Sequence, residues 1–204
     1  MESRIARIIS YALHPLFMPT LGLILVFQLD TYMTSTLKEQ AYSLYFWVFT
    51  NTCIIPILIT LLMLNRKYIQ SLQMETLRER RLPFLFTGIF YFSTYLMLHQ
   101  VPLPPPIYSL FLGASLSVVA ALLISLRWKI SIHMIGVSGL VGAVVGIHQT
   151  LDGHTLPYLL ITLAFTGLAG FARLQLQAHN PPQVYAGALV GFLAVYLSVV
   201  SGIG

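Results

Sequence analysis

The sequence predicts an all-α fold: a polytopic membrane helical bundle of about seven transmembrane helices, in a single integral membrane domain that covers residues 1–204. Composition is the first reason, because 57% of the residues are hydrophobic and only 8% are charged, whereas soluble domains carry about 25% charged residues. The mean hydropathy of +0.81 is the second reason. A soluble core cannot bury this much apolar surface, so we expect lipid to surround most of the chain.

Seven apolar stretches are candidates to cross a hydrocarbon core roughly 30 Å thick, which needs about 20 mostly apolar residues. They are Ile8–Leu29, Ala41–Asn65, Pro83–Gln100, Pro106–Leu126, Ile130–Ile147, Leu156–Phe171 and Gln183–Ile203. The first contains His14-Pro15 and Pro19, so we expect a kink or an irregular start there. The third, fifth and sixth are short and are expected to extend into their loops. Small residues recur along the fifth, which predicts close helix packing: Gly136, Gly139, Gly142 and Gly146.

The cations are distributed unequally when seven spans are threaded through a membrane. One side receives Arg4, Arg7, Arg66, Lys67, Arg78, Arg80, Arg81, Arg127, Lys129 and Arg173, and the other receives Lys38. Lysine and arginine collect in cytoplasmic loops, so we expect a multi-pass protein of the cell inner membrane with a cytoplasmic N-terminus. The net charge of +5 then reports topology, and no nucleic-acid partner is expected.

Other features set limits on the chain. Cys53 is the single cysteine, so no disulfide forms within the chain. No small-residue cleavage site follows the first apolar stretch, so no removable signal peptide is expected. Residues 66–82 form a polar amphipathic loop between the second and third spans, and basic side chains there suit anionic head groups. We interpret Pro83 as the N-terminal proline of the next helix.

Three polar patches converge on the basic side. The first is Arg78–Pro83, the second Lys129–His133, and the third runs from Arg173 to His179. The fifth and seventh spans begin on this side, and helix N-termini favour anions through unpaired N–H groups and the macrodipole. Arginine side chains fork onto phosphate oxygens. Together these features predict an oxyanion site at the membrane surface.

Two histidines give this site a possible chemistry. His133 lies one turn into the fifth span, and His179 stands just before the seventh. One imidazole can attack phosphorus to form a phosphohistidine, while the other protonates the leaving alkoxide. Arginines and helix N-termini would neutralise the charge that builds on the equatorial oxygens. This mechanism requires no metal and no cofactor.

The three patches resemble the signature motifs of the type-2 phosphatidic acid phosphatase superfamily of membrane lipid phosphatases, which read K-x6-R-P, P-S-G-H and S-R-x5-H-x3-D. The third patch matches best, through Arg173, five residues and His179. The second matches at Ser131 and His133, and the first supplies only an arginine and Pro83. The order of the motifs also fits that family, and the resemblance covers roughly Arg78 to the C-terminus. It implies a six-helix phosphatase-like core.

The resemblance implies a role for each matching position. His179 corresponds to the nucleophile and His133 to the general acid. The phosphate-binding positions are Arg173, Ser131 and one of Arg80 or Arg81, and Lys129 is well placed to help although it matches no family position.

The chain departs from the pattern at two positions. Gln183 stands where the family has an aspartate that orients the nucleophile and supports its positive charge, and Ile132 replaces the motif glycine. In a serine protease, loss of the corresponding aspartate cost about 10⁴-fold. Glu75 or Glu79 lies on the correct side to substitute. The chain is therefore predicted to be a divergent member with a degenerate third motif.

The leading hypothesis is a phosphatase-like protein that hydrolyses a lipid phosphate of the phosphatidate or polyprenyl phosphate type. Its partners would be that lipid or another anionic lipid, and membrane lipids. The alternatives are a catalytically impaired homologue that binds or transports an anionic lipid, and a structural subunit of a larger complex; the sequence does not indicate the oligomeric state. Ser131 is as well suited to capping a helix as to binding phosphate. For His14, a hydrogen-bonded structural role is the simpler interpretation.

Overall fold

The computed structural model describes residues 2–29, 38–74, 76–150 and 154–202, and within these ranges it is helical with no β-strand. Six helical segments there are long and apolar enough to cross a membrane: Glu2–Gln28, Gln40–Asn65, Pro105–Ile124, Ile132–Thr150, Leu156–Gln175 and Pro181–Ser201. The prediction of an all-α membrane helical bundle is therefore confirmed. Six of the seven predicted stretches meet this criterion in the described part of the chain.

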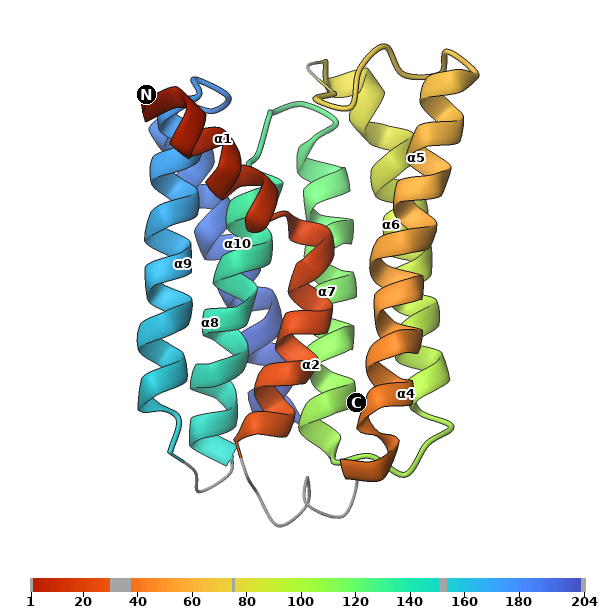
Figure 1. Ribbon diagram of the computed structural model, residues 1–204, viewed down its shortest axis with the longest axis vertical. Helices are drawn as coiled ribbons and strands as arrows, with labels where there is room; N and C mark the ends of the chain where they lie inside the picture. Colours follow the sequence, from red (N-terminus) through yellow and green to blue (C-terminus); the bar gives the residue numbers. More distant parts are fainter. Residues whose placement is uncertain (1, 30–37, 75, 151–153, 203–204) are drawn as a thin grey trace.

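The first predicted span is broken in the middle. Helix α1 (Glu2–Ala12) ends before His14, a 3₁₀ turn η1 covers Pro15–Phe17, and α2 (Met18–Gln28) continues inward. Prolines stand in the first turn of both η1 and α2, where a missing N–H costs little. The predicted irregularity is confirmed. Figure 1 shows α1 tilted across one end of the bundle, whereas α2 runs along its axis.

The second span combines three helical segments. They are α4 (Lys38–Phe49), the π-helical turn η2 (Thr50–Ile54) and α5 (Ile55–Asn65). Pro56 supplies no N–H to the preceding turn and its ring crowds the carbonyls there, so a wider turn fits at this point.

Helix α6 (Leu77–Leu98) begins earlier than the sequence suggested. Thr76 caps it, and the side chain of Glu79 completes a capping box with Thr76. The last residues of the predicted 66–82 loop are thus the first turns of α6. Pro83 lies inside this helix, so its interpretation as the N-terminal proline is wrong. The capping box outweighs the proline signal because it satisfies the backbone donors at the start of the helix, about two turns before Pro83.

The remaining helices are α7 (Pro105–Ile124), α8 (Ile132–Thr150), α9 (Leu156–Gln175) and α10 (Pro181–Ser201). The short third, fifth and sixth stretches do extend beyond their predicted bounds. In Figure 1 the starts of α6, α8 and α10 and the ends of α5, α7 and α9 lie at the same end of the bundle as the N-terminus, while the C-terminus lies toward the opposite end. This end carries all three polar patches.

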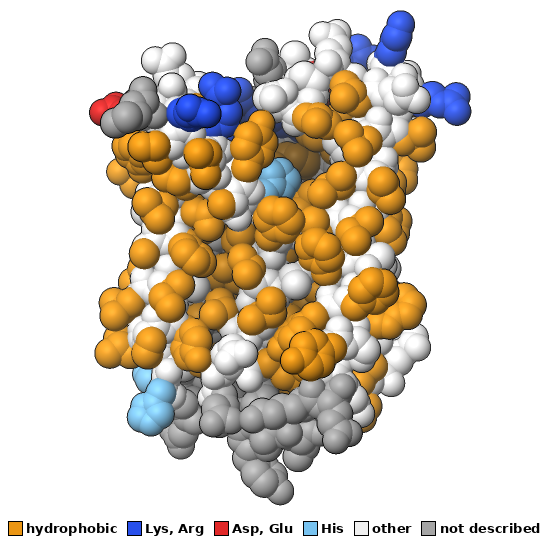
Figure 2. Space-filling view, viewed as in Figure 1, with side chains coloured by type: hydrophobic (Ala, Val, Ile, Leu, Met, Phe, Trp, Pro, Cys, Tyr) orange, Lys and Arg blue, Asp and Glu red, His pale blue; other side chains and the backbone are white. Residues whose placement is uncertain are grey.

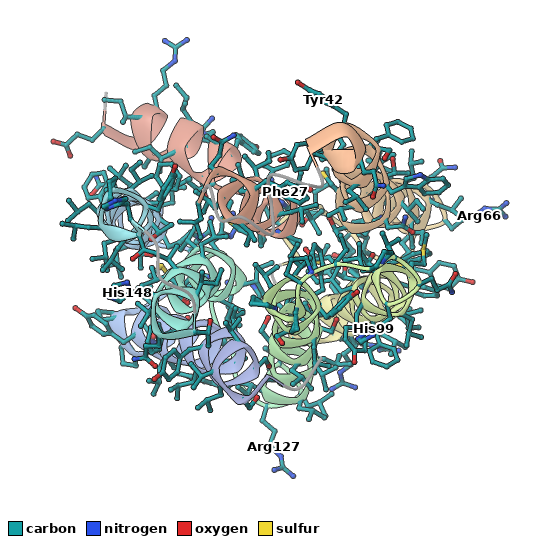
Figure 3. The ribbon with its side chains drawn as sticks, turned by 90° about the horizontal axis from the view of Figure 1, so that it is seen from below. Phe27, Tyr42, Arg66, His99, Arg127 and His148 are labelled. Carbon is teal, nitrogen blue, oxygen red and sulfur yellow. The ribbon has the colours of Figure 1, made fainter. Side chains whose placement is uncertain are left out.

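Helix α8 is the centre of the packing. Its candidate span is 72% buried, against 22% for α9. It packs against α9 and most extensively against α10, and α7 joins α10 to α6. Seen along the axis in Figure 3, α8, α9 and α10 group on one side and α4 to α7 on the other. The candidate residues at the start of α8 are therefore held by neighbours on several sides.

Glycines allow α8 and α10 to approach closely. A Cβ on Gly142 would stand 2.5 Å from the Phe192 carbonyl oxygen, and one on Gly146 would stand 2.9 Å from the side chain of Val199. Gly136 instead faces Met18 of α2, 2.9 Å from its Cγ. The predicted packing role of the glycine stripe is confirmed, and it serves two neighbouring helices.

The outer surface of the bundle is apolar. Figure 2 shows hydrophobic side chains over the length of the visible face, with lysine and arginine side chains at one rim. Large exposed hydrophobic residues occur on α5, α7, α9 and α10, for example Leu58, Leu116, Leu160 and Leu189. Arg66 and Arg127 point away from the bundle in Figure 3. Such a surface suits lipid along its length and head groups at the rim.

We expect Gly142→Ala to destabilise the protein, because its methyl group would overlap the α10 backbone and overpacking costs about 1–3 kcal/mol. Gly167→Ala is the matched control, since a Cβ there has no atom of the described chain within 4 Å and alanine favours helix. Thermal unfolding in detergent should show a lower transition temperature for Gly142→Ala alone. Equal transition temperatures would contradict the close α8–α10 contact.

Candidate functional site

Arg80 links the first polar patch to the second by a hydrogen bond. Its side chain is only 5% exposed. The guanidinium donates from Nη1 to the Ile130 carbonyl oxygen (3.1 Å) and from Nε to the Met74 carbonyl oxygen (3.0 Å). Arg81, by contrast, is exposed. The structure therefore distinguishes two arginines that the sequence left equivalent, and it directs Arg80 toward the start of α8.

Ser131 links the second polar patch to the start of α10, just after the third patch, by a hydrogen bond. Its backbone N–H donates to the Gln183 carbonyl oxygen (3.3 Å). Gly187 permits this approach, since a Cβ there would lie 2.6 Å from the Ser131 carbonyl oxygen. The Ser131 hydroxyl is buried and has no hydrogen-bond partner in the described chain. It therefore does not cap α8, which leaves the phosphate-contact interpretation of this hydroxyl open.

Arg173 and His133 meet at Ser10 of α1. The Arg173 guanidinium donates from Nη1 to Ser10 Oγ (2.7 Å). The Nε2 atom of His133 lies 3.1 Å from the Ser10 carbonyl oxygen. A carbonyl only accepts, so Nε2 carries the proton and Nδ1 holds the lone pair of the neutral ring.

His179 is oriented by Gln183. Its Nδ1 lies 3.0 Å from Gln183 Oε1. The same oxygen accepts from the Asn180 backbone N–H (3.3 Å), and an N–H can only donate, so this contact assigns the amide oxygen. Nδ1 of His179 must therefore donate, and Nε2 is left with the lone pair. Gln183 thus selects the tautomer of His179 through an uncharged amide oxygen.

The start of α10 offers fewer anion-binding N–H groups than we expected. Its first two residues are Pro181 and Pro182, which have no N–H. The Gln183 N–H donates to Asn180 Oδ1 (3.1 Å) in a capping box. The expectation of free donors at this helix start is therefore wrong, because the cap and the prolines remove them. The macrodipole remains, and the first-turn N–H groups of α8 have no such prolines.

The electrostatic surroundings keep His179 neutral. Burial lowers the pKa of this histidine to about 4, the hydrogen bond to Gln183 opposes that shift, and the nearby charges of Arg173, Arg80 and Lys129 lower it further. The imidazole is therefore uncharged at pH 7 and its Nε2 lone pair is available. Because the folded-state pKa lies below the ordinary 6.5, its contribution to stability is complete above pH 6.5 and falls as the pH drops toward 4.

Three buried polar atoms at this site lack a hydrogen-bond partner in the described part of the chain. They are Ser131 Oγ, His133 Nδ1 and Arg173 Nε. Native proteins rarely leave such atoms unsatisfied, and each calls for an explanation. A hydroxyl, an imidazole nitrogen and a guanidinium N–H together suit a ligand rich in oxygen. His133 also interacts electrostatically with Arg173 and His179, so the patches form one cluster.

Two acidic residues were candidates to replace the missing aspartate. Glu79 accepts hydrogen bonds from the backbone N–H groups of Gln70 (2.6 Å) and Thr76 (3.2 Å) and from the Thr76 hydroxyl. Its carboxylate is thus occupied in the turn before α6, and Gln183 holds His179 instead. Glu75 lies outside the described residues. Among those described, no three His, Cys, Asp or Glu side chains gather as a metal-binding group.

Ser10 and His14 are site neighbours that the three-patch analysis missed. The His14 ring lies edge-to-face against His133, with centroids 5.3 Å apart. Its Nδ1 accepts from the Leu16 N–H at 3.4 Å. One signal was present in the sequence, namely an ionisable residue inside an apolar span. No sequence signal placed α1 against the ends of α8 and α9.

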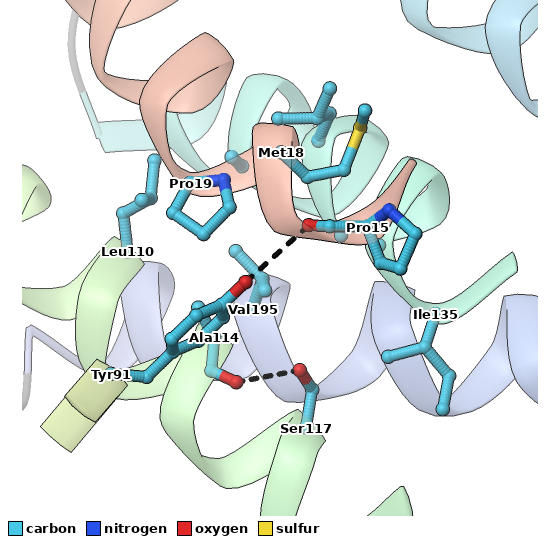
Figure 4. Close-up of a pocket in the computed structure, with 13 residues that line it drawn as sticks. Pro15, Met18, Pro19, Tyr91, Leu110, Ala114, Ser117, Ile135 and Val195 are labelled. Carbon is cyan, nitrogen blue, oxygen red and sulfur yellow. Dashed lines mark hydrogen bonds between the residues drawn. The ribbon is translucent and has the colours of Figure 1, made fainter. Parts of the chain in front are cut away.

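An apolar cavity closes the inner side of the site. It measures about 40 Å³ and lies beside Pro15, Tyr91 and Ile135 (Figure 4). Tyr91 donates to the Pro15 carbonyl oxygen (3.4 Å) and Ser117 to the Ala114 carbonyl oxygen (2.7 Å), so its two hydroxyls are already paired. This space holds about one water molecule. No residue of the three polar patches lines it.

We expect Gln183→Glu to raise the pKa of His179, because a carboxylate stabilises the imidazolium while occupying the same position. Gln183→Leu should remove the acceptor and allow both neutral tautomers. Imidazole ¹⁵N chemical shifts, titrated by NMR, measure both properties. Native protein that shows the Nε2–H tautomer at pH 7 would contradict the assigned hydrogen bond.

Comparison with known proteins found no match: no protein-family model, no curated protein and no solved structure is similar to this chain. The likeness to membrane lipid phosphatases therefore depends on the residues of the three patches alone.

Proposed function

We propose that this chain is a membrane-embedded, divergent type-2 phosphatidic acid phosphatase-like protein that hydrolyses a lipid phosphate. The observation that carries the proposal is the setting of His179. Its neutral imidazole keeps the Nε2 lone pair, and it lies near the charges of Arg80 and Arg173. The hydrogen bonds given above for both guanidinium groups go to carbonyl and hydroxyl oxygens. Their charge remains available for a phosphate.

The reaction proceeds in two displacements at phosphorus. A monoanionic lipid phosphate first passes its proton to Nδ1 of His133. Nε2 of His179 then attacks the phosphorus, the P–O bond to the lipid breaks, and the leaving alkoxide takes that proton from Nδ1 of His133. Water then attacks the phosphohistidine, the P–N bond breaks, and Nδ1 of His133 receives the proton of that water. The products are a lipid alcohol and inorganic phosphate. Arg80 and Arg173 balance the charge on the equatorial oxygens.

A lipid is favoured over a soluble phosphate by the surroundings of the site. The helix starts that carry the cluster lie at one end of the bundle (Figure 1), and the visible face of the bundle is apolar (Figure 2). A crevice of about 260 Å³ opens between Ala12, Phe17, Thr20, Leu21 and Phe49. Phe17 packs edge-to-face on His14, with ring centroids 6.2 Å apart, and His14 in turn contacts His133. A chain in this crevice would place its head group near the histidines.

The proposal includes α6 as a seventh span and a cytoplasmic site. Helix α6 is 22 residues long and lies between α5 and α7 in the bundle. One stripe of it is exposed and apolar: Leu85, Ile89, Phe92 and Leu96. Seven spans put the two termini on opposite sides, and the basic rim then faces the cytoplasm under the positive-inside rule.

A second candidate function has its own observation in its favour. Gln183 carries no charge, so it cannot stabilise the positive ring of a phosphorylated His179 as a carboxylate does. A homologue with this change that retains Arg80 and Arg173 would bind an anionic lipid without hydrolysing it. Both functions predict binding of an anionic lipid, and only the first predicts release of phosphate from it.

We expect purified protein to release inorganic phosphate from phosphatidate or a polyprenyl phosphate, and His179→Ala to abolish release by removing the nucleophile. Arg173→Ala should lower kcat/KM by about 100-fold or more, the size of effect seen when a group that stabilises transition-state charge is removed. Arg127→Ala is the matched control, because that arginine points away from the bundle. A wild-type protein that binds these lipids without releasing phosphate would favour the second candidate.

The orientation can be tested with single cysteines in a Cys53→Ala background. We expect Gln73→Cys, in the turn before α6, to react with a membrane-impermeant maleimide only from the cytoplasmic side. Gln100→Cys, at the other end of α6, should react only from outside. Both side chains are exposed. The reverse pattern would overturn the proposed orientation, and labelling of both from one side would overturn α6 as a span.

A further inference from the structure

The C-terminal turn of α1 reaches into the site through one residue. Ser10 is only 7% exposed, and both of its oxygen atoms are engaged by site side chains. Its hydroxyl accepts from Arg173 of α9, and its carbonyl accepts from His133 of α8. These partners lie 163 and 123 residues away in sequence. A residue outside the three patches therefore contacts two of the proposed phosphate-site residues directly.

We propose that Ser10 is a positioning residue of the anion site, one that acts through Arg173 and His133 without touching the phosphate. This inference rests on the proposed function and extends it to the N-terminal helix. The Ser10 hydroxyl anchors one end of the Arg173 guanidinium at 2.7 Å. The opposite edge, with its unpartnered Nε, is then held in one orientation. A guanidinium fork binds a phosphate well only when its plane is fixed.

The same residue fixes the tautomer of His133. Because its carbonyl holds Nε2–H, the buried Nδ1 is the nitrogen that exchanges protons with a leaving group. The ring of His14, four residues further along, packs against His133 at 5.3 Å. Two residues beside the break between α1 and α2 thus contact the His133 imidazole: the Ser10 carbonyl oxygen at Nε2, and the His14 ring at the ring. Because α1 ends here, the His14 N–H donates to the Tyr11 carbonyl oxygen, and the Ser10 carbonyl oxygen is left to accept from His133.

A simpler role for Ser10 would be to satisfy the hydrogen bonding of the half-buried Arg173. The two roles differ in what Ser10→Ala does. The alanine variant keeps the carbonyl and therefore the His133 bond, and it removes only the hydroxyl that holds Arg173. A purely structural hydroxyl would change stability, whereas a positioning hydroxyl changes the order of the guanidinium and the affinity for phosphate. Ser115→Ala is the matched control, because that buried hydroxyl donates within its own helix, to the Phe111 carbonyl oxygen.

The first test needs no ligand and no activity. With ¹⁵N-labelled arginine and protein in nanodiscs, we expect the Arg173 side-chain N–H signal to be rigid in wild type and in Ser115→Ala. It should become mobile in Ser10→Ala. An equally rigid signal in Ser10→Ala overturns the inference whatever the protein does to lipids.

The second test is a double-mutant cycle with phosphatidate as the probe and phosphatidylcholine as the reference lipid. Native mass spectrometry measures retained lipid, and phosphate release measures kcat and KM. We expect Ser10→Ala to weaken phosphatidate binding about tenfold, the size for one hydrogen bond to a charged group. It should add no further loss in an Arg173→Ala background. Independent, additive losses would overturn the inference.

The two tests separate the inference from the function beneath it. If wild-type protein prefers neither phosphatidate nor a polyprenyl phosphate to phosphatidylcholine, the proposed lipid phosphate function fails. A rigid Arg173 that becomes mobile in Ser10→Ala would still support positioning by α1 in that case. If wild type prefers phosphatidate and Ser10→Ala binds it equally well, the function stands and the inference fails.

Discussion

The structure depends on one constraint: two arginine side chains, Arg80 buried and Arg173 half-buried, lie at the end of a membrane bundle and must be satisfied by the protein. Arg80 and Arg173 use backbone carbonyls and a serine hydroxyl for the hydrogen bonds described above. Such bonds stabilise the guanidinium groups while leaving their charge uncancelled, which a carboxylate would not do. The bonds to the Ile130 carbonyl and to the Ser10 hydroxyl also cross between segments that are distant in sequence. The charge of the site and the junctions between its helices therefore have the same origin.

Close helix packing sets the spacing of this site. The glycine contacts between α8 and α10 bring their starts together, so that the Ser131 N–H reaches the Gln183 carbonyl oxygen. A larger residue at Gly187 would move Ser131 and His133 away from the His179 loop. Stability and site geometry are thus coupled through small residues, as is common where membrane helices lack a hydrophobic drive to associate.

Much of the fold was readable from the sequence, because apolar length and proline position are local signals. The helical class, six of the spans and the break at His14 followed from them. The sequence also drew attention to Arg173, Ser131, His133 and His179, which the structure gathers at one end. It missed Ser10, whose importance depends on α1 folding over α8 and α9. It also misjudged the start of α10, where the Asn180 cap and two prolines leave fewer donors than a helix N-terminus usually offers.

The consequence of Gln183 is narrower than loss of the whole carboxylate function. The aspartate of the phosphatase motif has two roles toward the histidine: it selects the tautomer of the ring and it stabilises the positive charge of the ring. The amide oxygen of Gln183 performs the first, because the Asn180 N–H fixes its orientation. In the proposed reaction, charge stabilisation becomes important only after His179 attacks phosphorus, when its ring becomes positive. Ground-state orientation of His179 is therefore preserved while support of its charged form is reduced. In the proposed phosphatase, this combination would lower turnover more than binding.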